Sequence, residues 1–205
     1  MNKISLNKIT ETYNRGSVIY QEGARMKGFC CVQKGIAKIF KTGLDGKEQI
    51  IRFAKPGDFI GYRSAITNET ACTTAEVLET CTLCHIPTTI LTELVRSNGD
   101  FALALIKLTC KELGEANAYI TDIAQKTVKE RLAEIVIRLD EEFGVDSEGI
   151  LNIILTREEL SNLVGTATES IIRLLSEFRN DRLIELKVRK IKILDRPGLK
   201  QIAGL

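Results

Sequence analysis

The segment from Thr156 to Leu175 constrains this chain more than any other part of the sequence. Its apolar residues are spaced so that two short helices, joined by a turn, share one inner face. These inner residues are Leu160, Leu163, Val164, Ile171, Leu174 and Leu175. Ser161 is small enough for the helices to approach closely, and Gly165 supplies the positive φ that the turn needs. The pattern predicts a helix-turn-helix, which places its second helix in the major groove of duplex DNA.

The second helix leaves Thr168, Glu169, Ile172 and Arg173 facing outward. We expect Thr168, Glu169 and Arg173 to read bases. Arg173 suits a bidentate contact with guanine O6 and N7, and Glu169 can accept from a cytosine amino group. Glu169 also fits a capping box with Thr166, so a structural role is the alternative.

The residues that follow favour DNA binding over another kind of helical hairpin. Residues 183–186 and 191–194 alternate as short strands around the basic segment 187–190. This predicts a β-hairpin wing. From Arg179 to Lys200 there are eight Lys or Arg and three acidic residues, whereas the whole chain has a net charge of only +2. The residues expected to contact phosphates are Thr156, Arg157, Thr166, Ser170, Lys187, Arg189 and Lys190.

Composition excludes several classes of protein. A length of 205 residues, with 44% hydrophobic and 27% charged residues, fits two small domains. No apolar run is long enough to cross a membrane. Six cysteines without a signal peptide indicate a cytoplasmic protein. The single histidine, His85, argues against a histidine-ligated metal centre and against serine-histidine catalysis, so we expect no enzyme.

Residues 16–86 have a β pattern, in which short runs are separated by glycine turns. The runs are 17–21, 29–33, 36–41, 48–53, 73–78 and 82–86, with turns at Gly23, Gly35, 44–46 and 56–58. Short strands at this spacing predict a sandwich or barrel.

A short helix over 88–96 and a long helix over 100–125 follow the β pattern. The long helix carries a seam with spacings of three and four. The seam residues are Leu103, Ile106, Cys110, Leu113, Asn117, Ile120 and Ala124. This seam predicts helix–helix dimerisation, with Asn117 setting the register; the alternative is a helix that packs on its own β domain. Thr127 and Glu130 form a capping box, as do Thr156 and Glu159. We expect an effector domain over 1–98, a dimerisation helix and hinge over 99–126, and a DNA-binding domain over 127–205.

The order of these elements and several motifs together resemble one protein family. The motifs are Tyr20-Gln21-Glu22-Gly23, Gly35, Asp45-Gly46-Lys47-Glu48, residues 56–61 (PGDFIG), Thr156-Arg157-x-Glu159, and Val164-Gly165 followed by Glu169 and Arg173. Over nearly its whole length the chain resembles the cyclic-AMP receptor protein/fumarate-nitrate regulator (CRP/FNR) family of bacterial transcription factors. The resemblance implies an α+β fold with a cyclic-nucleotide-binding-like β-barrel (jelly roll), a long dimerisation helix and a C-terminal winged helix-turn-helix. It also implies as partners a palindromic operator in double-stranded DNA, a second copy of the chain and RNA polymerase, with no membrane.

The sequence departs from the cyclic-nucleotide binders of this family. In those proteins a glutamate after the PGDFIG turn takes the ribose, and a later arginine-serine pair holds the phosphate. Here Tyr62 stands at the glutamate position, and residues 70–74 contain no arginine. Tyr62 and Arg63 are expected on the outer rim of a helical turn. We therefore expect no cofactor and no binding of cyclic AMP. An unidentified effector would meet Phe59, Ile60, Gly61, Tyr62, Ala71, Cys72, Thr73, Leu113 and Asn117.

The cysteines fit no metal site. Iron-sulfur sensors of the family carry an N-terminal cysteine cluster, whereas residues 1–29 contain no cysteine. Cys81 and Cys84 should point to opposite faces of a strand, as should Cys30 and Cys31, which is typical of core residues. The function predicted is a homodimeric, sequence-specific transcription regulator whose effector domain re-aims the DNA-binding domains. The alternatives are a thiol-redox-responsive regulator of the same fold and a ligand-binding module that does not bind DNA.

Overall fold

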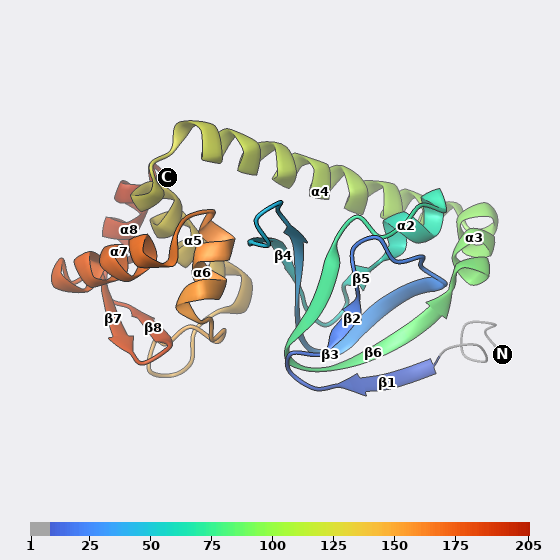
Figure 1. Cartoon of the computed structure of the whole chain (residues 1–205), viewed down its shortest axis with the longest axis horizontal. Coiled ribbons are helices and arrows are strands. Elements are labelled where there is room, and N and C mark those ends of the chain that lie inside the picture. The colour runs from blue at the N-terminus through green and yellow to red at the C-terminus, as the bar shows by residue number, and fades with distance from the viewer. Residues whose placement is uncertain (1–8) are drawn as a thin grey trace. The chain divides into compact units, whose positions relative to one another are not determined.

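The computed structural model describes residues 9–205. The chain packs as two compact units, Met1–Gly114 and Glu115–Leu205. Each is described by itself below, and helix α4 contributes residues to both (Figure 1).

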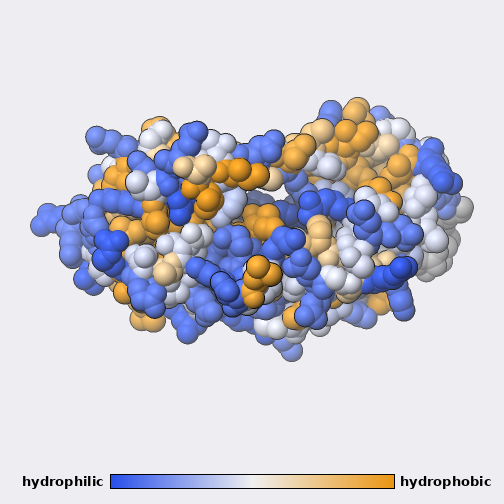
Figure 2. Space-filling model, turned by 45° about the horizontal axis from the view of Figure 1, so that its top comes forward, coloured by the Kyte–Doolittle hydropathy of each residue, from blue (hydrophilic) through white to orange (hydrophobic). Residues whose placement is uncertain are grey.

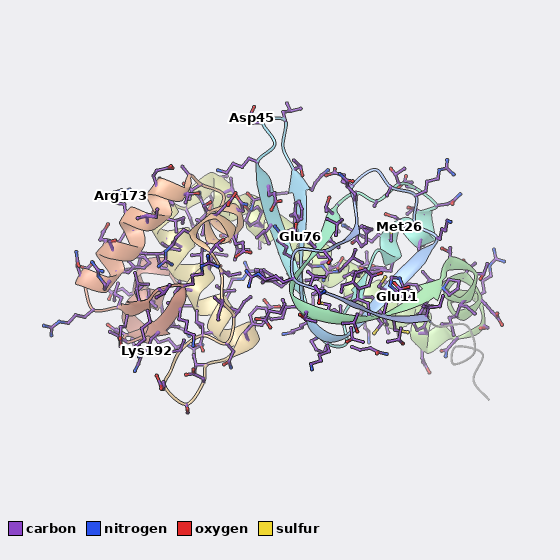
Figure 3. All side chains as sticks on the ribbon, turned by 60° about the horizontal axis from the view of Figure 1, so that its bottom comes forward. Glu11, Met26, Asp45, Glu76, Arg173 and Lys192 are labelled. Carbon is purple, nitrogen blue, oxygen red and sulfur yellow. The ribbon has the colours of Figure 1, made fainter. Side chains whose placement is uncertain are left out.

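The first unit is built on an antiparallel sheet. Its strands are β1 (Ile9–Tyr13), β2 (Val18–Tyr20), β3 (Gly28–Thr42), β4 (Glu48–Ala54), β5 (Phe59–Ile60) and β6 (Thr74–Pro87). The hydrogen-bonded order is β1-β6-β3-β4, with β2 also paired to β6 and β5 to β3. Small and branched side chains fill its interior, among them Cys30, Val32, Ile39, Val77, Cys81 and Leu83. Asp45 lies at the tip of the β3–β4 hairpin (Figure 3).

The expected turn at Gly35 is wrong, because Gly35 lies inside the continuous strand β3. It has φ 85°, and the β3–β6 register shifts on either side of it. A Cβ at this position would come within 2.2 Å of the Thr80 carbonyl oxygen. The glycine therefore marks a bulge in a long strand, where the backbones of β3 and β6 approach closely. The run expected over 82–86 likewise joins that over 73–78 in the single strand β6.

Three helices complete the first unit: α2 (Tyr62–Thr67), α3 (Thr88–Ser97) and the first part of α4 (Gly99–Gln125). They share a second apolar cluster with the sheet. Its buried members are Phe29, Tyr62, Ala65, Leu91 and Leu105. Leu105 is the buried residue through which α4 packs into this cluster of the first unit.

The second unit contains α5 (Val128–Phe143), α6 (Arg157–Val164), α7 (Thr168–Asn180), the β7 (Ile184–Lys187) and β8 (Lys190–Ile193) hairpin, and α8 (Arg196–Ala203). The six residues expected on the inner face of the helix-turn-helix are all buried, which confirms that face. Among residues 9–205, no helix is both long and apolar enough to cross a membrane.

Candidate DNA interface and effector pocket

The helix-turn-helix follows from a cap at its start and a glycine at its turn. The Thr156 hydroxyl accepts from the Glu159 backbone N–H at 3.0 Å, and the Thr156 N–H donates to Glu159 Oε2 at 2.6 Å. The predicted capping box is therefore confirmed. Gly165 ends α6 with φ 73°, and Ser161 contacts Thr168 across the turn with 3.0 Å between hydroxyl oxygens.

Helix α7 presents a face of mostly exposed side chains. Glu169, Ile172 and Arg173 are exposed, whereas Thr168 is half-buried and its hydroxyl is engaged with Ser161. The alternative role of Glu169, a capping box with Thr166, is not formed, because α7 is capped by Ala167 without a side-chain bond. No hydrogen bond or ion pair ties the Glu169 side chain to any residue from 9 to 205. Figure 3 shows Arg173 on α7 and Lys192 on the adjoining hairpin.

The β7–β8 hairpin forms the predicted basic wing, with Lys187 opposite Lys190 across its turn. Val188 lies at the tip with φ 57° and is 91% exposed. A positive φ is strained for a β-branched residue. Arg157 Nη2 donates to the Val188 carbonyl at 3.1 Å, and burial lowers the pKa of the Arg157 guanidinium. Arg157 thus connects the start of α6 to the wing tip.

The remaining predicted phosphate contacts differ in how freely they can reach a ligand. Lys187 lies 3.6 Å from Glu148 and 4.0 Å from Glu185, so part of its charge is balanced locally. Arg189 and Lys190 are exposed at the wing, and Ser170 is half-buried beside the start of α7. The charge of Lys190 acts on Asp146, so the wing offers its least balanced positive charge at Arg189.

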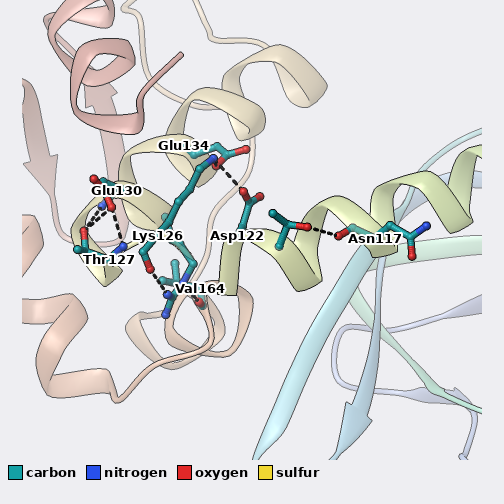
Figure 4. A network of polar contacts seen from close by, with 9 residues as sticks. Asn117, Asp122, Lys126, Thr127, Glu130, Glu134 and Val164 are labelled. Atoms are coloured by element: carbon teal, nitrogen blue, oxygen red, sulfur yellow. Dashed lines mark hydrogen bonds and ion pairs between the residues drawn. The ribbon is translucent and has the colours of Figure 1, made fainter. Parts of the chain in front are cut away.

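The junction between α4 and α5 is held by polar contacts (Figure 4). Lys126 Nζ lies 2.9 Å from Asp122 and 2.5 Å from Glu134. Arg131 donates to the Lys126 carbonyl at 2.7 Å and to the Val164 carbonyl at 3.1 Å. The predicted Thr127 capping box is present as well. These bonds join the last turn of α4 to the turn of the helix-turn-helix.

The centre of the first unit contains a polar cluster where a small effector was expected. Tyr62 is 2% exposed, so the expected place on an outer rim is wrong for this residue. Its hydroxyl donates to Glu112 Oε2 at 2.8 Å, and Arg52 Nη2 lies 3.3 Å from Glu112 Oε1. Arg52 also donates to the Phe59 carbonyl at 2.9 Å. Burial, with the bond to Glu112 adding to it, raises the pKa of Tyr62 to about 12.

These side chains leave little space. The cavity beside them has a volume of about 20 Å³, whereas ligand pockets measure about 300–1,000 Å³. Arg63 is exposed and donates to Cys72 Sγ at 3.3 Å. A cyclic phosphate needs a paired cation or several N–H donors. The residues here do not fit that ligand, because Arg52 is paired with Glu112.

The cavity is lined by only part of the predicted set. Gly61, Tyr62, Ala71, Cys72 and Thr73 line it, together with Tyr20, Ile39, Arg52, Arg63, Ser64 and Glu112. Phe59, Ile60, Leu113 and Asn117 are absent from the lining. The sequence did offer one signal for Glu112, an acidic residue one position before the seam residue Leu113. Nothing local distinguishes Arg52 within strand β4.

Cys30 forms a contact that no pattern in the sequence indicated. Its Sγ lies 3.2 Å from His85 Nδ1, and His85 Nε2 lies 3.0 Å from the Tyr13 hydroxyl. Burial raises the pKa of the Cys30 thiol to about 12. A thiol that stays protonated is a poor metal ligand and nucleophile. In the described part of the chain, no three His, Cys, Asp or Glu side chains gather where a metal ion could bind.

Each of the two units matches a known domain family. The cyclic nucleotide-binding domain family matches residues 10–98, and the Crp-like helix-turn-helix domain family matches residues 130–202. Electron transport regulator A of Shewanella oneidensis is 31% identical over 192 residues, which cover 93% of this chain and 76% of that protein. The fumarate and nitrate reduction regulatory protein of Escherichia coli (strain K12) is 27% identical, with the same coverage of each chain.

The fold is also found in solved structures. FixK2 from Bradyrhizobium japonicum superposes with a TM-score of 0.85 at 22% identity, covering 95% of this chain and 96% of that one. Two domain families in this order, and a relative above 30% identity over most of both chains, establish the class. The chain therefore belongs to the CRP/FNR family and is a DNA-binding transcription regulator with an effector-sensing domain.

Proposed function

We propose that the protein is a homodimer that binds a palindromic operator and regulates transcription without catalysing a reaction. The observation that carries this proposal is the outward face of α7, where Glu169 and Arg173 are exposed beside a basic wing. The two residues are four positions apart, so both can enter the major groove from one helix face. A regulator of this kind acts in the cytoplasm, where bacterial DNA lies.

The seam of α4 supports dimerisation. All seven seam residues are exposed in the single chain, including Ile120 at 65%, whereas Leu105 on another face of α4 is buried. Apolar residues gather along the face on which α4 lies (Figure 2). A contiguous apolar stripe of this kind is typical of an interface. A second copy of the chain would cover it, with Asn117 paired across the seam. The division into residues 1–98, 99–126 and 127–205 stays a proposal, as does contact with RNA polymerase.

Base reading and phosphate contact are assigned to different residues. Arg173 would contact guanine, and Glu169 would accept from a cytosine amino group. Thr168 is the weakest of the three proposed base readers, because Ser161 already engages its hydroxyl. The phosphate contacts proposed are Thr156, Arg157, Thr166, Ser170, Lys187, Arg189 and Lys190. Arg157 would act chiefly by holding the wing tip in place.

The effector domain would not respond to a cyclic nucleotide. Tyr62, Arg52 and Glu112 occupy the centre of the pocket, and Glu112 belongs to α4. Isothermal titration calorimetry should therefore detect no binding of cyclic AMP at micromolar protein. A cyclic nucleotide that binds and raises the melting temperature would contradict this assignment. The thiol-redox alternative has less support at Cys30 and Cys81, because both are buried and burial raises the pKa of both thiols, so it would have to act through the exposed Cys72 or Cys110.

A selection of bound duplexes from a random library tests the proposed function. The wild type should return a palindrome with half-sites about one helical turn apart. Arg173→Ala should weaken binding by about 1–3 kcal/mol and flatten the preference at one base pair in each half-site. Lys190→Ala, the matched control, should weaken binding to all sequences alike and reduce its salt dependence. An unchanged motif of unchanged strength with Arg173→Ala would refute this model of recognition.

A further inference from the structure

One apolar side chain on α7 takes no part in the core of its unit. Ile172 is 50% exposed, whereas its neighbours Ile171 and Leu174 are 0% and 3% exposed. Every other Ile, Leu, Val or Phe of α6 and α7 is buried. Single exposed aliphatic residues are common on protein surfaces, so the exposure alone says little. The position of Ile172 says more.

Ile172 lies on the proposed base-reading face. It follows Glu169 by three residues, which is about one helical turn, and it directly precedes Arg173. Two hydroxyl groups of α7 are used within the protein: Thr168 contacts Ser161, and Ser176 donates to the Ile172 carbonyl at 2.9 Å. The exposed groups of this face are thus one carboxylate, one guanidinium and one branched aliphatic side chain.

The chemistry of the major groove offers one match for an aliphatic side chain. The base edges there carry hydrogen-bond donors and acceptors, and the only apolar group is the C5 methyl of thymine. Isoleucine can neither donate nor accept, and opposite a donor or acceptor it would leave that group desolvated and unpaired. Because Ile is β-branched, its χ1 is nearly fixed in a helix, so little conformational entropy is lost on contact.

We propose that Ile172 reads a thymine methyl group at one position of each operator half-site, between the bases contacted by Glu169 and Arg173. The inference rests on the proposed function, since it requires α7 in the major groove. It adds an apolar specificity contact to the two polar ones, so the operator should contain a thymine that hydrogen bonding alone would not select.

The test replaces thymine by deoxyuridine, which removes only the methyl group. Each thymine of the selected operator is replaced in turn, symmetrically in both half-sites, and the Kd is measured by fluorescence anisotropy. Loss of one buried methyl is expected to weaken wild-type binding about fourfold per half-site at one position. Ile172→Ala should bind the thymine and deoxyuridine operators equally. Leu194→Ala, which removes a similarly exposed side chain at 51%, should keep the discrimination of the wild type.

The outcomes separate the two proposals. If the wild type binds the operator but tolerates deoxyuridine at every thymine, the Ile172 contact is refuted and the proposed function stands. If Ile172→Ala retains the wild-type discrimination, another residue reads the methyl and the assignment is again wrong. If the wild type selects no sequence from the library, both proposals fail. Because Ile172 is exposed, its truncation should leave the melting temperature unchanged, which thermal unfolding checks.

Discussion

At the scale of single residues, Tyr62 determines what the effector domain can hold. Its ring fills the space, and its hydroxyl satisfies Glu112 beside Arg52. Tyr62→Phe keeps the ring and removes one hydrogen bond, so the free energy of unfolding should fall by about 1 kcal/mol. Tyr62→Ala should cost about 3–5 kcal/mol because it empties a fully buried site. Urea denaturation measures both. Equal losses for the two variants would mean that packing of the ring contributes little.

The buried thiol of Cys30 should make the free energy of unfolding depend on pH in the alkaline range. Burial raises the pKa of its thiol to about 12 in the folded protein, compared with about 8.5 in an unfolded chain. Its contribution to stability is therefore fully present below about pH 8.5 and is lost as the pH rises toward 12. Between these values the unfolded thiol ionises while the folded one does not.

The expected size of this effect follows from the linkage relation. Cys30 should add a slope of up to about −1.4 kcal/mol per pH unit to the free energy of unfolding above pH 9. Urea denaturation of wild type and Cys30→Ala between pH 7 and 10 should show a shallower decline for the variant. Cys72→Ala, which removes an exposed cysteine, serves as the control and should retain the wild-type slope. Parallel curves for wild type and Cys30→Ala would contradict the prediction.

At the scale of elements, strand β3 depends on the bulge at Gly35. An alanine Cβ there would meet the Thr80 carbonyl oxygen at 2.2 Å, and φ 85° is strained for any other residue. Gly35→Ala should therefore lower the free energy of unfolding by at least about 3 kcal/mol. Gly46→Ala is the matched control, since Gly46 has φ 74° but no atom within 4 Å of the added Cβ. It should cost about 1–2 kcal/mol from strain alone. Similar losses for both in guanidinium denaturation would show that the backbone of β6 yields easily.

At the scale of the whole molecule, assembly should govern DNA binding. Ile120 is exposed in the C-terminal part of the seam of α4, and Ile120→Glu would place a charge in an apolar interface. Sedimentation should show a wild-type dimer and a monomeric variant at micromolar concentration, with weak operator affinity for the variant. Ala118→Glu adds the same charge on another face of α4 and should remain dimeric. A monomeric wild type at this concentration would rule out the dimer.

Local spacing in the sequence was sufficient to predict much of the DNA-binding unit. The inner face of α6 and α7, the caps at Thr127 and Thr156 and the Gly165 turn depend on residues at most about fifteen positions apart. Helix periodicity and capping each act over about three or four residues, so both can be recognised within such a short segment. Local spacing can also mislead. Thr166 and Glu169 have the spacing of a capping box, but α7 begins at a different cap, Ala167.

Other features were decided only by the tertiary structure, because they depend on contacts between residues that are distant in the chain. Arg52, Tyr62 and Glu112 come from a strand and two helices, and no periodicity in the sequence relates them. The role of Gly35 depends on the register of β3 against Thr80, and that of Arg157 on a carbonyl at the wing tip. The sequence by itself thus determined the helix-turn-helix and its outward residues, because these arise from local periodicity. The tertiary structure decided that the pocket is filled, because burial of distant polar partners is set by the packing of the whole unit.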